Sequence, residues 1–117
     1  MPALKPCFAA MKTLMPRSPT ELTLEALRKD GYTAQVTEHR VPVIHILRDL
    51  FGFIDVLGLR PGETLGVQCT SRANVSSRMQ KIADHELFPR VLEAGWTVEV
   101  WGWDKYKGRY RVRRERM

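Results

Sequence analysis

Three side chains with oxygen donors flank a short turn in the middle of the chain. Asp55 lies in the apolar run Phe51–Leu57, and Gln68 and Thr70 lie in the apolar run that follows a Pro-Gly turn. Strands joined by so short a turn lie side by side, which brings Asp55 next to Gln68. Because side chains alternate along a strand, Thr70 shares a face with Gln68. Carboxylate, amide and hydroxyl oxygens suit a hard divalent cation such as Mg2+ or Mn2+, the usual electrophile in phosphodiester hydrolysis.

Each of these residues also has a simpler structural interpretation. Asp55 can cap a turn or pair with Arg48 or Arg60, but a carboxylate inside an apolar run is costly unless a charged group meets it. That cost favours the metal-ligand role. Gln68 can instead make hydrogen bonds at a sheet edge. Cys69 has the opposite strand parity to Gln68 and is predicted to be a core residue and not a nucleophile.

The pattern resembles the PD-(D/E)XK nuclease superfamily, which includes restriction enzymes and the archaeal Holliday-junction resolvases. In that fold a helix supplies a glutamate, a strand supplies an aspartate, and the next strand supplies Glu-x-Lys or a variant. Asp55 matches the aspartate, and Gln68-Cys69-Thr70 stands at the Glu-x-Lys position. The resemblance covers about Ser18 to Trp103. It implies a single α/β domain with a central mixed β-sheet flanked by helices, restriction-endonuclease-like, in the order α-β-β-β-α-β.

The resemblance also implies an activity. We expect a metal-dependent DNA endonuclease that hydrolyses phosphodiester bonds, similar to small resolvase-like, phage or mobile-element members, which usually act as homodimers. Asp55 and Gln68 then bind Mg2+ or Mn2+, and Thr70 positions the attacking water. Thr70 carries no charge where the family usually has lysine, so it cannot stabilise developing phosphorane charge. The alternative is therefore a catalytically inactive nuclease-fold module that binds nucleic acid or a protein partner.

Three glutamates are candidates for the helix-borne metal ligand. Glu21 is favoured, because its placement ahead of Gly31 is similar to the resolvase pattern, and Glu25 lies one helical turn later. Glu38 can reach the site from the first strand. Each has a structural alternative, since Glu21 can cap the helix, Glu25 can be solvated and Glu38 can pair with an arginine.

Asp49 is predicted to lie away from this site. It has the same strand parity as Asp55 but precedes it by six residues (55 − 49). In one continuous strand that separation is about 20 Å, too far for both carboxylates to bind one metal ion. We therefore interpret Asp49 as the partner of an arginine.

Positive charge is concentrated at the end of the chain. The net charge is +6 with a pI of about 9.7, and seven of the 19 Lys and Arg residues follow Asp104. Such a cluster near tryptophans and tyrosines suits phosphate contacts, although a solvated, charge-protected edge strand has the same pattern. A second group of cations falls where the next helix begins, after Ser71, which is interpreted as its N-cap. The candidate nucleic-acid-binding residues are Arg72, Arg78, Lys81, Lys105, Lys107, Arg109, Arg111 and Arg113.

The pattern of apolar residues and turn signals predicts the elements that position these side chains. Residues 1–17 are expected to be a poorly ordered N-terminal arm, and residues 18–117 the nuclease-like domain, with the basic segment 105–117 at its end. Helices are expected from Ser18 to about Asp30, around Val75 to Ile82, and from Pro89 to Gly95. The expected strands are Tyr32–Glu38, His45–Leu59, Thr64–Thr70, Trp96–Trp103 and Arg109–Arg114.

Composition sets further limits. The 117 residues suffice for one domain, and no apolar run reaches the about 18 residues of a membrane span. The cysteine and histidine spacing matches no zinc site or disulfide framework, so a cytoplasmic location is the default expectation. No histidine is paired by motif with a nucleophile, which leaves Ser-His and Cys-His mechanisms without support.

Overall fold

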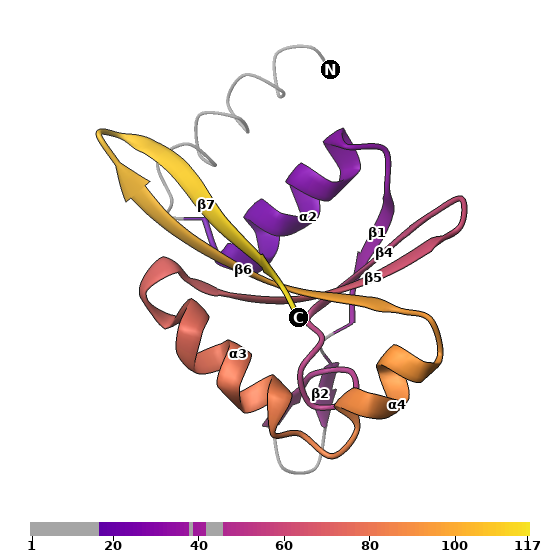
Figure 1. Cartoon of the computed structure of the whole chain (residues 1–117). Coiled ribbons are helices and arrows are strands. Elements are labelled where there is room, and N and C mark those ends of the chain that lie inside the picture. Colours follow the sequence, from indigo (N-terminus) through magenta and orange to yellow (C-terminus); the bar gives the residue numbers. More distant parts are fainter. Residues whose placement is uncertain (1–16, 38, 42–45) are drawn as a thin grey trace.

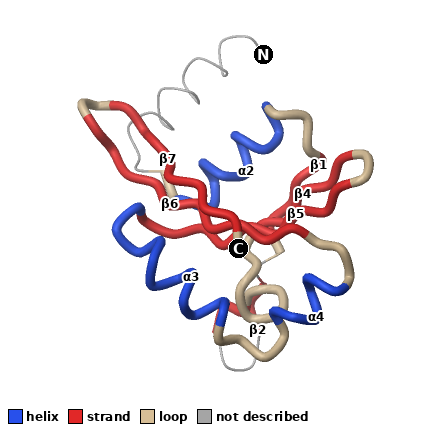
Figure 2. Tube along the Cα trace, in the orientation of Figure 1, coloured by secondary structure: helices blue, strands red, loops and turns tan. Residues whose placement is uncertain are grey.

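The computed structural model describes residues 17–37, 39–41 and 46–117. Five strands form a mixed sheet in the order β1-β4-β5-β6-β7, with α2 on one face and α3 and α4 on the other (Figures 1 and 2). The predicted α/β class with a mixed, helix-flanked sheet is confirmed. The elements are α2 (Pro19–Lys29), β1 (Thr33–Val36), β2 (His39–Val41), β3 (Ile46–Arg48), β4 (Val56–Arg60), β5 (Glu63–Ser71), η1 (Arg72–Asn74), α3 (Val75–Ala83), α4 (Phe88–Glu93), β6 (Thr97–Tyr106) and β7 (Arg109–Arg116).

Strand direction follows from the connections. β1, β4 and β5 pair antiparallel, and so do β6 and β7. β5 and β6 are parallel, so the chain must cross from one end of the sheet to the other between them, and α3 and α4 make that crossover. None of the helices among the described residues is long and apolar enough to span a membrane.

Helix α2 begins and ends where local sequence signals predict. The Ser18 hydroxyl accepts a hydrogen bond from the Glu21 backbone N–H at 3.1 Å, and Pro19 occupies the first turn. Gly31 follows the helix with φ of 92°, a conformation that glycine adopts without strain. The helix packs Leu27 against Val56, Val67 and Trp101 on one face of the sheet.

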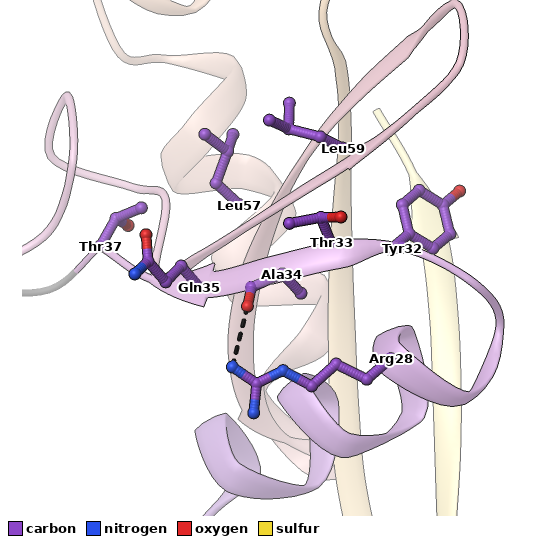
Figure 3. A pocket seen from close by; sticks show the side chains of 8 residues that line it. All are labelled: Arg28, Tyr32, Thr33, Ala34, Gln35, Thr37, Leu57 and Leu59. Carbon is purple, nitrogen blue, oxygen red and sulfur yellow. Dashed lines mark hydrogen bonds between the residues drawn. The ribbon is translucent and has the colours of Figure 1, made fainter.

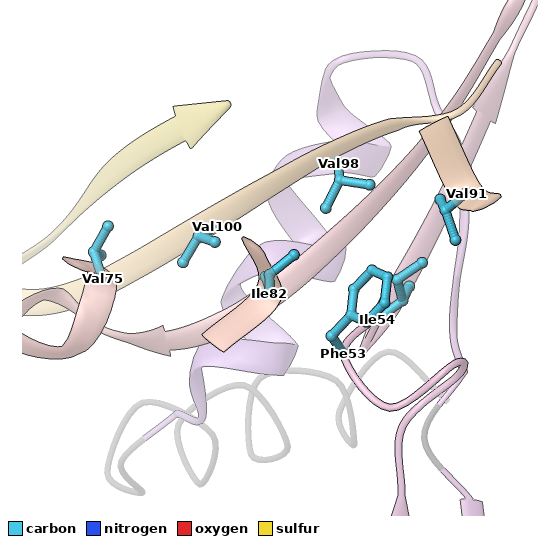
Figure 4. Close-up of a cluster of buried hydrophobic side chains, with 7 residues drawn as sticks. All are labelled: Phe53, Ile54, Val75, Ile82, Val91, Val98 and Val100. Carbon is cyan, nitrogen blue, oxygen red and sulfur yellow. The ribbon is translucent and has the colours of Figure 1, made fainter. Parts of the chain in front are cut away.

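A second apolar cluster covers the opposite face. Phe53, Ile54 and Val100 pack there against Val75 and Ile82 of α3 (Figure 4), and Val98 and Val91 extend the cluster. Close approach of α3 requires a glycine on β6. A Cβ atom at Gly102 would lie 2.2 Å from Val75 Cγ2 and 2.8 Å from Arg72 Cα. The chain that leaves β5 is therefore packed directly onto β6.

The prediction of one strand over His45–Leu59 is wrong. β3 ends at Arg48 and pairs with β2 in a separate two-stranded sheet, and β4 begins only at Val56. Between them the chain reverses at Phe51 and Gly52, whose φ angles are 56° and 87°. Reciprocal backbone hydrogen bonds of 3.0 Å join Leu50 and Ile54 across this turn. The continuous apolar run hid the turn, because Phe51 adopts a left-handed conformation that its residue type does not predict.

The remaining elements agree with the sequence within a few residues. β5, α3, α4 and β6 fall where expected, and β6 and β7 extend further than predicted. The expected N-terminal arm lies outside the described residues except for Arg17, which forms an ion pair with Glu25.

The contact at Gly102 gives a stability prediction. Gly102→Ala is expected to lower the free energy of unfolding by about 1–3 kcal/mol, because the new methyl group overlaps Val75 and the backbone of η1. Urea denaturation followed by circular dichroism measures the change. In a Val75→Ala background the penalty for Gly102→Ala should be smaller, since one of the overlapping groups is gone. Equal penalties in the two backgrounds would contradict the assigned cause.

Candidate functional site

Asp55 and Gln68 meet on one face of the sheet. Val56 pairs with Val67, and the Asp55 backbone N–H donates to Val67 O at 2.9 Å, which sets Asp55 beside Gln68. Asp55 Oδ2 accepts hydrogen bonds from Gln68 Nε2 at 2.6 Å and from the Cys69 backbone N–H at 2.8 Å. Both side chains are buried, with exposed fractions of 6% and 4%. The predicted proximity of these residues is confirmed.

Asp49 also lies at this site, so its exclusion on the basis of strand length is wrong. The reversal at Phe51 and Gly52, closed by the isolated bridge between Leu50 and Ile54, returns the chain so that Asp49 and Asp55 lie near each other. A side-chain hydrogen bond joins the Asp49 and Asp55 carboxyl groups. The 20 Å separation assumed a straight strand, whereas the chain reverses between the two residues.

Burial and the second carboxyl group change the protonation of Asp55. Burial is the largest cause, and the hydrogen bond with Asp49 adds to it, so the pKa of Asp55 rises from 3.8 to about 8. The Cys69 N–H and the Gln68 amide act in the opposite direction, because they stabilise the carboxylate. Without a cation at the site, Asp55 is therefore largely protonated near neutral pH.

Thr70 extends the same face by one strand period. It is buried, with an exposed fraction of 6%, and it pairs with Gly102 of β6. Cys69 between Gln68 and Thr70 packs with the cluster under α2, as its parity predicted. Burial raises the pKa of the Cys69 thiol to about 12, so the thiol stays protonated at neutral pH. This chemistry agrees with the interpretation of Cys69 as a core residue.

The glutamate candidates are placed differently. Glu21 is exposed on α2 and its backbone N–H binds the N-cap Ser18. Glu25 pairs with Arg17 and, at 3.8 Å, with Lys29, while Glu38 lies outside the described residues. Among the described residues, no three His, Cys, Asp or Glu side chains form a metal-binding group. Within that part of the chain, the acidic component of the site is the pair Asp49 and Asp55.

Most arginines of β7 are already paired with carboxylates. Arg111 binds Asp104 at 2.7 Å, and Arg113 binds Glu115 at 3.1 Å. Two further pairs join β7 to other elements, Arg114–Asp30 at 3.7 Å and Arg116–Glu99 at 3.0 Å. β7 is an edge strand of the sheet. This agrees with the alternative interpretation of the basic segment as a charge-protected edge strand. Within the described residues no salt bridge involves the other basic candidates, which are Arg72, Arg78, Lys81, Lys105, Lys107 and Arg109.

A pocket of about 420 Å3 lies beside the candidate site and not over it. Its walls come from the end of α2, from β1 and from β4, and Arg28 donates a hydrogen bond to Ala34 O at 3.0 Å there (Figure 3). Thr37 joins this pocket to the site, since its backbone N–H binds Asp55 O at 2.9 Å and its hydroxyl binds Ile54 O at 2.7 Å. No sequence pattern pointed to Thr37. For Asp49 the available signal was Gly52, which permits the reversal.

No protein-family model matches the chain, and neither does any curated protein or solved structure. What the site can do is therefore inferred from its own residues. Asp49, Asp55, Gln68 and Thr70 present only oxygen ligands, which fit Mg2+ or Mn2+ and do not fit a soft metal. The buried Asp55 carboxyl group, whose pKa is raised, also needs a counter-charge once it is ionised.

The pKa of Asp55 predicts a pH-dependent stability. In buffer that contains a metal chelator, the free energy of unfolding of the wild-type protein should fall as the pH rises from about 4 to 8. In this range Asp55 keeps its proton in the folded state and loses it in the unfolded state. Each pH unit in this window lowers the free energy of unfolding by up to about 1.4 kcal/mol. Asp55→Asn removes this contribution, so the variant should be more stable than wild type at pH 8, with a difference that shrinks toward pH 4. Urea unfolding across this range measures the difference. A pH-independent difference would contradict the protonation of Asp55.

Proposed function

We propose that the protein is a divalent-metal-dependent DNA endonuclease with a restriction-endonuclease-like fold. One observation carries the proposal: Asp49, Asp55 and the Gln68 amide lie together, largely shielded from solvent, on one face of the sheet. A buried carboxyl group beside a half-buried one has no evident role in packing. The two groups form the arrangement expected of ligands for a hard cation.

The order of elements supports this fold. Leaving out the β2–β3 hairpin, the chain runs α2, β1, β4, β5, α3, α4 and β6, which agrees with the expected α-β-β-β-α-β order. The first three strands are antiparallel and the last is parallel to β5. Asp55 precedes β4, and Gln68 and Thr70 lie on β5, which are the positions that the resemblance assigns to the family motif.

Each residue of the site has a separate role in the proposed chemistry. The Cys69 N–H and the Gln68 Nε2 both hold Asp55 Oδ2, which orients the carboxylate and leaves Oδ1 for the cation. Asp49 adds a second carboxylate, and Gln68 Oε1 a neutral ligand. A bound Mg2+ or Mn2+ supplies Lewis acid chemistry, polarising a phosphate and acidifying water. The Thr70 hydroxyl positions the water. Glu21, the first choice for a further ligand on sequence grounds, is not part of this set, because it is exposed on α2 and α2 covers the opposite face of the sheet.

Phosphate contacts belong in the proposal as well. Arg72 follows two residues after Thr70, and Arg78 and Lys81 lie on the crossover helix α3. Their charges attract the DNA backbone toward the face that carries Asp55. A homodimer, a cytoplasmic location and a phage or mobile-element substrate are further expectations of the same proposal.

The second candidate function is an inactive nuclease-fold module that binds nucleic acid or a protein partner. It is favoured by Thr70, which is buried and uncharged where catalysis in the family usually relies on lysine. The two functions differ in one measurable property, since only the enzyme cleaves DNA.

The metal site is tested by calorimetric titration of Mn2+ into the free protein. We expect Asp55→Ala to abolish binding and Asp49→Asn to weaken it at least about tenfold, because each removes a charged ligand. Glu86→Gln, which removes an exposed acid beyond α3, is the matched control and should bind like wild type. Equal affinity in Asp49→Asn and wild type would remove Asp49 from the site.

Cleavage is tested on plasmid, single-stranded and branched DNA in Mg2+ or Mn2+. Wild type should cut at least one form, and Asp55→Ala should cut none while keeping its fold and its DNA affinity, since the phosphate contacts are untouched. Wild-type protein that binds Mn2+ and DNA but cuts no DNA form would favour the inactive module.

A further inference from the structure

The β6–β7 hairpin continues past the rest of the sheet. β5 accompanies β6 only as far as the pair Ser71 and Trp103, whereas β6 and β7 remain paired out to Tyr106 and Arg109. In the segment Asp104–Arg111, here called the ribbon, two strands therefore pair with each other, and none of the other described strands lies beside them. It projects from the body of the molecule (Figure 1).

The tip of the ribbon has a defined conformation. Lys107 and Gly108 connect the two strands, and both have positive φ, 51° and 77°. Positive φ at both central positions is typical of the type I′ turn, whose twist matches that of the flanking strands. The ribbon is thus a regular hairpin that can enter a groove without reordering.

The ribbon carries three basic side chains that form no salt bridge with any described residue. Lys105, Lys107 and Arg109 are exposed, and within the described residues none of them forms a salt bridge. The one acid of the ribbon, Asp104, pairs with Arg111. By contrast, three arginines of β7 beyond the ribbon are each paired with a carboxylate: Arg113, Arg114 and Arg116.

Two exposed tyrosines of the ribbon contact basic side chains through their rings. Tyr106 has an exposed fraction of 53%, with the Arg111 guanidinium 4.4 Å and the Lys107 ammonium 5.4 Å from its ring centre. Lys105 lies 5.1 Å from the ring centre of Tyr110. Because Lys105 pairs with Tyr110 and Tyr106 pairs with Arg109, these two pairs lie on opposite faces of the ribbon. Each face therefore presents a cation and an aromatic ring.

We propose that the ribbon enters the major groove of duplex DNA and holds the duplex across the candidate site. The major groove, about 12 Å wide, admits a two-stranded ribbon, and cations on both faces can then reach the phosphates on either side. Gly102 pairs with Thr70, and Tyr106 lies four residues further along β6, about 13 Å or four base-pair steps away. The inference rests on the proposed function and adds to it that the substrate at the ribbon is double-stranded.

Two variants with the same loss of charge test the ribbon. The ribbon variant is Lys105→Gln, Lys107→Gln and Arg109→Gln, and the control is Arg113→Gln, Arg114→Gln and Arg116→Gln. Anisotropy with a duplex of about 20 base pairs is measured in EDTA across a salt series, after circular dichroism has confirmed folding. The ribbon variant should bind at least about tenfold more weakly, with a salt slope lower by about 2–3. The control should stay within about twofold. If the triple control does not fold, Arg109→Gln is compared with Arg113→Gln.

The groove is tested with modified DNA. Glucosylated 5-hydroxymethylcytosine fills the major groove and should weaken wild-type binding more than binding by the ribbon variant, whereas netropsin in the minor groove should have no effect. Equal losses in the ribbon and control variants, competition by netropsin, or tighter binding to single strands would each overturn the proposal. Because EDTA prevents metal-dependent cleavage, these results are independent of the endonuclease assay. If the protein never cuts DNA, weaker binding by the ribbon variant still supports the proposed role of the ribbon. If the protein cuts DNA but the ribbon variant binds it like wild type, only the inference about the ribbon is overturned.

Discussion

The burial of the Asp55 carboxyl group is the constraint on which the candidate site depends. A buried acid requires hydrogen-bond donors, and the sheet provides them in a fixed geometry through the Cys69 N–H and the Gln68 amide. Asp49 makes the requirement stricter, because its neighbouring carboxyl group further raises the pKa of Asp55. Either a bound proton or a bound cation can compensate the negative charge of this pair. The protonation of the metal-free protein is therefore linked to the proposed metal chemistry.

The cost of that arrangement is met by the layers around it. Apolar side chains from the crossover helices cover the face that carries Asp55, and α2 covers the opposite face with a second cluster. Val56 and Val67, which flank Asp55 and Gln68, point into the α2 cluster and fix the strand pairing. The polar pair is thus held between two well-packed layers, which restricts the positions that its oxygen atoms can adopt.

Local signals in the sequence predicted the parts of the fold that depend on neighbouring residues. Ser18, Pro19 and Gly31 defined α2, and the Pro-Gly turn placed Asp55 beside Gln68. The turn at Phe51 was missed because an apolar run gives no sign of a left-handed residue, and Asp49 was misplaced with it. Two ion pairs of β7 were also beyond prediction, since their acids, Asp30 and Glu99, come from other elements. Counting charges along the chain therefore overstated the free positive charge.

The short connection between β4 and β5 has a consequence for how the chain folds. Only Pro61 and Gly62 separate these strands, whereas the crossover from β5 to β6 spans residues 72–96. Loop-closure entropy grows with the length of the connection, so Asp55 and Gln68 can meet at a small entropic cost before the parallel pairing is complete. Their hydrogen bond also rewards one register, because a one-residue slip of β5 would turn Gln68 into the apolar layer under α2. The polar pair that serves the proposed chemistry thereby also selects the correct alignment of the sheet.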